Sequence, residues 1–328
     1  MADNARKWTD KQLAQMEKHI HKEYLQANKE LTEKWNNWKS ASTEKYDALQ
    51  KAWKEAIGTD LEKDAHEELL AYGRSMIRTD AYYRELVEAT AMQLTRANQT
   101  AVAYLNGQMP SIYAKNYAQV KPSADVLGIN FKTRSEATVK RLITQKKIKL
   151  PKKKLSIPKD LQWNTKKLNS AVLQGVLQGD SIQQIAKRIK PIVGNNEQAA
   201  IRNARTMVTG AENQGRMDSY HQLEEDGVVL KKVWIATADG RTREWHLSMD
   251  GQEVDIDENF VDGEGNELAF PGDPSADPST VYNCRCSMKT HIVGFRRRDG
   301  SVEKVDIDSE RPSFHGQQID YERGRRRR

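Results

Sequence analysis

Apolar residues recur at spacings of three and four along the first third of the chain, as on one face of an amphipathic helix. The first stripe consists of Leu13, Met16, Ile20, Tyr24, Ala27, Leu31, Trp35, Trp38, Tyr46, Leu49, Trp53 and Ile57. A second stripe runs from Leu69 to Leu105, and Gly58 lies between the two. This pattern predicts two long helices that form an antiparallel hairpin, with a weak point in the first helix at residues 40–43.

Capping boxes, in which Ser or Thr is followed three residues later by Glu or Gln, mark the starts of predicted helices. They occur at Thr9/Gln12, Thr59/Glu62, Thr133/Glu136 and Ser181/Gln184. Pro110 is expected to end the second arm of the hairpin, before a short helix over 111–119. Further helices are predicted over 166–178, 181–189 and 196–226. Pro151 and Pro158 forbid a continuous helix between them, so the segment around 146–158 is expected to be an extended linker or a hairpin.

The character of the sequence changes after Gly227. Residues 228–230 and 233–236 are β-branched and aromatic, which favours strands, and short strands separated by Gly, Asp and Pro continue to Val293. Val302, Val305 and Ile307 are expected to add an edge strand. The predicted fold class is α+β: a mainly helical N-terminal region with a long antiparallel hairpin, then a small α+β domain. The predicted domains are a hairpin region over 1–120, a basic connector over 121–165, the α+β domain over 166–295 and a loosely ordered tail over 296–328.

The composition agrees with an elongated helical part and one small core. Only 37% of the residues are hydrophobic and 30% are charged, which leaves little material for a thick buried core. The sequence contains no apolar run long enough to span a bilayer, and its N-terminus lacks the apolar segment of a signal peptide. We therefore expect a protein made in the cytoplasm, without a membrane as partner.

Positive charge is concentrated in two places. Residues 140–167 carry ten Lys and Arg141 against the single Asp160, whereas the whole chain has a net charge of +7. A second basic cluster, Arg323 and Arg325 to Arg328, closes the chain. The expected DNA contacts are Lys146, Lys147, Lys149, Lys152, Lys153, Lys154, Arg325, Arg326, Arg327 and Arg328. Such patches bind phosphate without reading bases. Two alternatives are a solvated connector without a binding role and contact with an acidic surface of a capsid.

One series of short motifs lies in the last third of the chain. Arg241, Thr242, Arg243 and His246 are followed by Asp250-Gly251, Phe260, a Pro-rich loop over 270–274, and Asn283-Cys284-Arg285-Cys286. The preceding segment contains Arg205-Thr206, Asn213, Gly215-Arg216 and Tyr220. In this order the motifs resemble the signature of the bacteriophage Mu F-like head-morphogenesis family. The resemblance covers roughly 199–293.

The resemblance implies a minor capsid protein of the virion, bound at or near the portal vertex and present in the host cytoplasm during assembly. Relatives assist procapsid assembly and influence DNA packaging or delivery. The expected partners are the portal protein, other head proteins and DNA. Neither enzymatic activity nor a small-molecule substrate is expected.

His246, Cys284 and Cys286 have two interpretations. Thiolate and imidazole are the ligands that zinc prefers, and His291 or Asp250 would supply a fourth. In the other interpretation, the two Cys side chains lie on opposite faces of a strand and His246 bonds locally. The second is favoured because alternating strand positions rarely reach one ion, so zinc is a tentative cofactor and no other cofactor is expected.

Two other functions use the same sequence features. Arg241, Arg243, Glu244 and His246 offer an acid or base and cations for a phosphate, as in a small nuclease or transferase. A general nucleic-acid-binding protein would use the basic segments alone, and its resemblance to head proteins would be coincidental. Trp8, Trp35, Trp38 and Trp53 could stack on bases, but their helical spacing favours packing.

Overall fold

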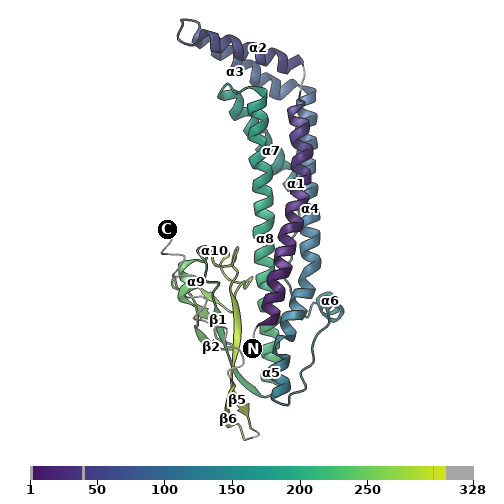
Figure 1. Ribbon diagram of the computed structural model, residues 1–328, viewed down its shortest axis with the longest axis vertical. Coiled ribbons are helices and arrows are strands. Elements are labelled where there is room, and N and C mark those ends of the chain that lie inside the picture. The colour runs from purple at the N-terminus through teal and green to yellow at the C-terminus, as the bar shows by residue number, and fades with distance from the viewer. Residues whose placement is uncertain (1–2, 39–40, 298, 308–328) are drawn as a thin grey trace. The chain divides into compact units, whose positions relative to one another are not determined.

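The computed structural model describes residues 3–38, 41–297 and 299–307 (Figure 1). The chain divides into two compact units. Unit 1 comprises Met1–Glu17, Tyr104–Lys153 and Arg202–Arg328, and unit 2 comprises Lys18–Ala103 and Lys154–Ile201. Three helices contribute residues to both units: α1 (Asn4–Asn36), α4 (Ala81–Tyr117) and α8 (Ile182–Glu225).

Unit 2 contains the predicted hairpin, but each of its arms consists of two helices. The other helices of the unit are α2 (Ala41–Ala56), α3 (Glu62–Thr79) and α7 (Ile157–Leu177). Helices α1 and α4 run antiparallel: Trp35 Nε1 donates to Thr90 Oγ1 at 2.9 Å, and Gln93 bonds Glu30. Helices α2 and α3 pack together at the closed end, where Trp53 stacks on His66 with ring centroids 4.6 Å apart. The predicted fold class is therefore confirmed for the helical region.

Local hydrogen bonds explain where these arms begin and break. The capping box expected at Thr9 is wrong, because Asp3 accepts the Arg6 amide at 2.8 Å and α1 begins at Asn4. The Thr9 hydroxyl instead donates to the Ala5 carbonyl inside the helix. In the second arm, Asp80 is extended and its carboxylate accepts the Tyr83 amide at 2.9 Å. This residue ends α3 and caps α4, a break that the apolar spacing does not predict.

The apolar stripes form the interior of unit 2. Trp35 and Trp38 are each 1% exposed, and Tyr83 packs against both rings. The two indoles meet edge to face, with centroids 5.5 Å apart. Packing, rather than base stacking, is thus the role of these two tryptophans, because their rings are closed to solvent.

Prolines did not end helices where the sequence predicted. Helix α4 continues through Pro110 to Tyr117, and α8 continues through Pro191. A proline inside a helix costs about 3 kcal/mol. Ile112 and Tyr113 beyond Pro110, and Ile192 and Val193 beyond Pro191, are all buried, and this tertiary burial offsets the lost hydrogen bond. The expected separate helices over 111–119, 181–189 and 196–226 are therefore parts of longer ones.

Helix α7 also begins earlier than expected, at Ile157 rather than at 166. Pro158 lies in its first turn, where the missing amide has no partner to lose. The capping box at Ser181 forms as predicted: the Ser181 amide donates to Gln184 Oε1, and the Gln184 amide donates to Ser181 Oγ.

Unit 1 combines helix ends with a small antiparallel sheet. Its short helices are η1 (Ala118–Val120), α5 (Lys121–Val126), α6 (Glu136–Thr144), α9 (Glu244–Ser248) and α10 (Pro278–Val281). Its strands are β1 (Val228–Ile235), β2 (Glu253–Asp255), β3 (Phe260–Val261), β4 (Glu267–Leu268), β5 (Ser287–Arg296) and β6 (Val302–Ile307). The main sheet has the order β2-β1-β5-β6, and β3 and β4 form a separate pair. The predicted edge strand is β6.

The core of unit 1 lies between this sheet and the helices. Trp234 of β1, Met288 and Ile292 of β5, and Tyr220 of α8 are fully buried in one cluster. Gly227, with a φ of +89°, ends α8 and leads directly into β1. The chain thereby places its last long helix beside the strands that flank the signature motifs. Within the described residues, no helix is long and apolar enough to cross a membrane.

Two glycines in unit 1 provide a matched test of helix packing. A Cβ at Gly215 of α8 would lie 2.5 Å from the Tyr113 carbonyl oxygen of α4, whereas a Cβ at Gly107 would meet nothing within 4 Å. We expect Gly215→Ala to lower the free energy of unfolding by about 2 kcal/mol or more, because backbone must move. Gly107→Ala should raise it by roughly 0.5–1 kcal/mol. Urea denaturation of both variants measures the contrast, and equal effects would contradict the close packing of α8 on α4.

Candidate functional site

The first part of the signature lies in the loop between β1 and β2. Asp250 Oδ1 accepts the Ala236 amide at 2.9 Å, and the Gly251 amide donates to the Trp234 carbonyl at 2.9 Å. Gly251 has a φ of +79°, a conformation that glycine adopts without strain. Asp250-Gly251 therefore closes the loop that carries α9 back onto the end of β1. This closure fixes the position of His246.

The second part, Asn283 to Cys286, is an irregular segment that precedes β5. Asn283 has a φ of +59°, a left-handed conformation in which Asn is among the more favourable residues. Side chains of α8 bond the segment at successive positions. Thr206 Oγ1 accepts the Asn283 amide at 2.8 Å, Thr209 Oγ1 donates to the Cys284 carbonyl at 2.6 Å, and Asn213 Nδ2 donates to the Cys286 carbonyl at 3.2 Å.

The same face of α8 continues to bond the start of β5. Asn213 Oδ1 accepts the Met288 amide at 3.1 Å, and Arg216 Nη1 donates to the Met288 carbonyl at 3.0 Å. Thr206, Thr209, Asn213 and Arg216 are three or four residues apart, so they share one face of the helix. We call these four side chains the polar stripe of α8. They explain why the helix and the Cys-containing motif occur together in the sequence.

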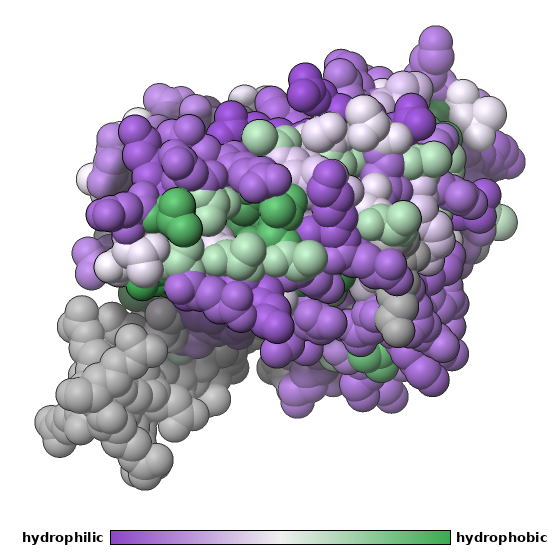
Figure 2. Space-filling view, turned by 90° about the horizontal axis from the view of Figure 1, so that it is seen from above, coloured by the Kyte–Doolittle hydropathy of each residue, from purple (hydrophilic) through white to green (hydrophobic). Residues whose placement is uncertain are grey.

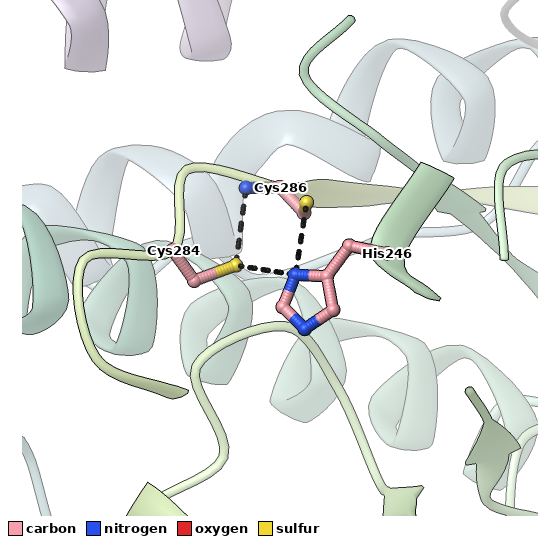
Figure 3. A group of neighbouring side chains, drawn as sticks. All are labelled: His246, Cys284 and Cys286. Carbon is pink, nitrogen blue, oxygen red and sulfur yellow. Dashed lines mark hydrogen bonds between the residues drawn. The ribbon is translucent and has the colours of Figure 1, made fainter. Parts of the chain in front are cut away.

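The structure brings His246, Cys284 and Cys286 into one buried cluster (Figure 3). His246 Nδ1 lies 3.7 Å from Cys284 Sγ and 3.8 Å from Cys286 Sγ, and the Cys286 amide donates to Cys284 Sγ at 3.4 Å. The three residues are 1–3% exposed. The expectation that the two cysteines lie on opposite faces of a strand is wrong, because β5 begins only at Ser287. In the irregular segment before it, both sulfurs face the imidazole.

The environment favours one thiolate. Hydrogen bonding with Cys286 raises the pKa of Cys284, and burial adds to this. The same hydrogen bond lowers the pKa of Cys286, and His246 further favours its charged form. Trp234 meets the His246 ring edge to face, with centroids 5.6 Å apart, and so limits the orientation of the imidazole.

The two residues considered as a fourth ligand lie outside this cluster. His291 is on β5, and its Nδ1 is 3.1 Å from Glu253 of β2. Burial raises the pKa of the Asp250 carboxyl, and the negative charge of a nearby Cys286 thiolate adds to this effect. In the described part of the chain, the ligand atoms that lie within 4.8 Å of one another at this site come from His246, Cys284 and Cys286.

The arginines of the signature contact a backbone carbonyl and a neighbouring carboxylate. Arg243 Nη2 donates to the Tyr282 carbonyl at 2.6 Å. Arg285 forms a two-pronged pair with Asp239, at 2.6 and 2.7 Å, while Arg241 is mostly exposed and lies 3.5 Å from Asp239. The hydrogen bonds from Arg285 lower the pKa of Asp239 to about 2. Arg285 and Asp239 therefore connect the Cys-containing segment to the loop after β1.

The N-terminal residues complete this region, which the sequence did not indicate. Arg6 Nη2 donates to the Arg285 carbonyl at 2.7 Å, and Asp3 accepts a 2.6 Å hydrogen bond from the fully buried Arg216. Glu212 is also buried, and its pKa is raised by burial against the opposing effect of Arg6 and Arg216. The i,i+4 spacing of Glu212 and Arg216 is the only feature of the sequence that indicates a pair, because it places the two side chains on one face of a helix. No local pattern connects them to residues 3–6.

The basic segment is fixed to unit 1 by its apolar residues and backbone. Ile148 is 8% exposed in the unit 1 core, and Pro151 fits against Gly210 of α8. Asn106 makes two 3.0 Å hydrogen bonds to the backbone of Lys153. Lys146, Lys147, Lys149, Lys152, Lys153 and Lys154 are all exposed, and within the described residues they form no ion pair. Arg325, Arg326, Arg327 and Arg328 lie outside the described residues.

In unit 1, a long helix thus bonds an irregular Cys-containing segment beside a four-stranded sheet. Comparison with known proteins names the family: residues 166–289 match the model described as phage Mu protein F like protein. The minor head protein GP7 of Bacillus phage SPP1 is 28% identical over 221 residues, which cover 63% of this chain and 70% of that protein. An NAD(+)–arginine ADP-ribosyltransferase, EFV, from Enterococcus faecalis is 32% identical over 140 residues, 41% of this chain. No solved structure gives a significant match.

Residues 166–289 are thus similar to the Mu F-like family, which confirms the resemblance that the motifs indicated. The family match supports a role in head morphogenesis. The chain spans only 28% of the length of the ADP-ribosyltransferase.

The Asp239–Arg285 pair makes stability depend on pH. Because the folded-state pKa of Asp239 is about 2 and the unfolded value is about 3.9, the pair stabilises the fold above pH 4 and is lost as the pH falls toward 2. We expect Asp239→Asn to cost on the order of 1 kcal/mol at pH 6, a discounted value because the side chain is one-third exposed. The difference from wild type should shrink between pH 4 and 2 in thermal melts. Asp60→Asn, an exposed turn residue, serves as control, and a pH-independent difference would refute the assignment.

Proposed function

We propose that this protein assists procapsid assembly and DNA packaging or delivery as a minor head protein near the portal vertex. The observation that carries the proposal is the match of residues 166–289 to the Mu F-like family, together with the similarity to a phage minor head protein over 70% of its length. In this proposal the portal protein and other head proteins are its partners, and DNA is bound without regard to sequence. Its location is the virion, after assembly in the host cytoplasm.

The basic segment 146–154 supports the proposed DNA contact. Its apolar residues Ile148, Leu150 and Pro151 are buried or half-buried, while the lysines between them are exposed. Burial of Ile148 and the hydrogen bond from the Lys153 amide to Asn106 fix the backbone, so the ammonium groups extend from an ordered segment. When these lysines neutralise DNA phosphates, counterions are released, which favours binding. Because the backbone of the segment is already ordered, binding does not have to order it. Nothing in this arrangement would read base edges.

Exposed apolar residues of unit 2 support attachment to a protein partner. The stripes of the hairpin are buried within the unit, so they need no external surface. At the turn between α2 and α3, however, Ile57 is 56% exposed and Leu61 is 67% exposed. Figure 2 shows a patch of apolar residues bordered by polar ones on the face at the end where α2 and α3 lie. A contiguous apolar patch that remains in water is typical of a surface that another protein covers.

The geometry gives no support to the nuclease or transferase alternative. His246 is 1% exposed and faces two sulfurs, while Arg243 is bonded to the Tyr282 carbonyl. An acid or base must reach the proton that it transfers, and this imidazole is closed to a phosphate substrate. The similarity to the ADP-ribosyltransferase covers 28% of that enzyme, and the activity in its name belongs to that protein. The family match also removes the reason to treat the signature as a coincidence in a host nucleic-acid-binding protein.

DNA binding should depend steeply on salt. Changing Lys146, Lys147, Lys149, Lys152, Lys153 and Lys154 to Gln should weaken binding equally for unrelated duplexes. It should also reduce the slope of log K against log salt by as much as about 5, since each phosphate contact contributes about 0.9. Fluorescence anisotropy with two duplexes of different sequence measures both effects.

A control of equal charge change uses six exposed lysines of α1 and α2: Lys11, Lys18, Lys22, Lys29, Lys34 and Lys54. This variant should keep most of the salt slope. Equal losses in the two variants would show that net charge, rather than the basic segment, determines binding.

Incorporation into heads should depend on the turn between α2 and α3. We expect the double variant Ile57→Asp, Leu61→Asp to reduce the copies per purified procapsid at least tenfold, because a charge in an apolar contact removes several kcal/mol of binding. Both side chains are exposed, so the thermal stability should change little. Val126→Asp, at a position that is 68% exposed in unit 1, is the matched control. Quantitative mass spectrometry of procapsids measures the outcome. Wild-type chain absent from particles would refute the head role, and normal incorporation of the double variant would refute the attachment surface.

A further inference from the structure

We propose that His246, Cys284 and Cys286 bind one Zn²⁺ ion, which joins the loop carrying α9 to the segment before β5. The three potential ligand atoms are Nδ1 and two Sγ atoms, and they come from two segments that are far apart in the sequence (Figure 3). This site is independent of the proposed role in heads.

The spacing of the ligand atoms fits tetrahedral zinc. With Zn–S near 2.3 Å and Zn–N near 2.0–2.1 Å, tetrahedral geometry separates a nitrogen from a sulfur ligand by about 3.6 Å. The observed separations are 3.7 Å to Cys284 and 3.8 Å to Cys286. Both nitrogen–sulfur separations therefore lie within about 0.2 Å of the tetrahedral value.

Burial and charge also fit a divalent cation. Two thiolates and one neutral imidazole neutralise Zn²⁺, so the loaded site carries no net formal charge in a region that excludes water. The Cys286 amide already donates to Cys284 Sγ at 3.4 Å, so a backbone donor holds this sulfur in place. Two thiolates with an imidazole also select zinc over magnesium or calcium, which prefer oxygen ligands.

The surrounding hydrogen bonds hold each ligand in place without the ion. The Cys284 carbonyl is bonded by Thr209 and the Cys286 carbonyl by Asn213, both from the polar stripe of α8. Asp250-Gly251 closes the loop that carries His246 onto β1. His246 Nε2 is buried and, within the described residues, has no hydrogen-bond partner. With Nδ1 on the metal, Nε2 carries the ring proton.

The cysteine content of the chain allows a stoichiometric test on the full-length wild-type protein. Cys284 and Cys286 are its only cysteines. Protein purified under reducing conditions without chelator should contain one zinc per chain by elemental analysis. Titration with a mercurial reagent should release that zinc, measured with a metallochromic dye, in proportion to the first two equivalents added. Less than 0.1 zinc per chain, even after incubation with ZnSO₄ and desalting, would overturn the proposal.

Variants then assign the ligands. Cys284→Ser, Cys286→Ser and His246→Gln should each lower zinc affinity at least tenfold and lower the melting temperature, because metal binding stabilises the folded state. His291→Gln and His221→Gln are the controls, and both should keep one zinc per chain. His291 pairs with Glu253, and His221 belongs to a separate group with Glu224 and Asp257. Loss of zinc in either control would overturn the assignment of ligands.

A spectroscopic measurement covers the case in which a variant does not fold. Wild-type protein loaded with Co²⁺ should show sulfur-to-cobalt charge transfer in the near ultraviolet and the visible bands of a tetrahedral site. X-ray absorption at the zinc edge should give two sulfur neighbours near 2.3 Å. A spectrum with oxygen or nitrogen ligands alone would place the ion elsewhere and refute the site.

Discussion

Residues 283–288 form a stretch of largely irregular backbone in the interior of unit 1, and the rest of that unit depends on how its polar groups are bonded. A buried amide or carbonyl without a partner costs on the order of 1–3 kcal/mol. Here the polar stripe of α8 bonds the segment from Asn283 to Met288. The helix therefore does more than cover the sheet: its side chains take the place of a neighbouring strand.

This requirement restricts both the helix and the loops that approach it. For the polar stripe to bond residues 283–288, α8 must stay regular from Thr206 to Arg216. Other segments of unit 1 must also be able to pack closely against the remaining sides of this helix. Gly215 lies against the Tyr113 carbonyl, and Gly210 lies between Pro151 and Gly272. Gly272, with a φ of +80°, brings the Pro-rich loop onto α8. Two small residues thus let one helix contact three separate parts of unit 1.

The features that support function are held by the same packing. The lysines of the basic segment are exposed because Ile148 and Pro151 are anchored beside α8, and the Cys/His cluster is buried because both of its segments are bonded to β1 or α8. In each case packing fixes the backbone, and the course of that backbone decides which side chains face outward or inward. DNA contact and metal binding would then rely on different parts of unit 1, and attachment to a head protein on the turn between α2 and α3 in unit 2.

The sequence by itself determined the features that depend on local periodicity and composition. These are the amphipathic stripes of the hairpin, the end of α8 at Gly227, the β-rich region after it, the basic segment and the family signature. It could not determine helix continuity at Pro110 and Pro191, because burial of distant residues offsets the cost of each proline. Alternation predicted opposite faces for Cys284 and Cys286. Only the tertiary structure shows that Asn283 turns the backbone and that α8 holds the segment, so that both sulfurs reach His246. Such contacts join residues separated by 38 or more positions, and no local pattern records them.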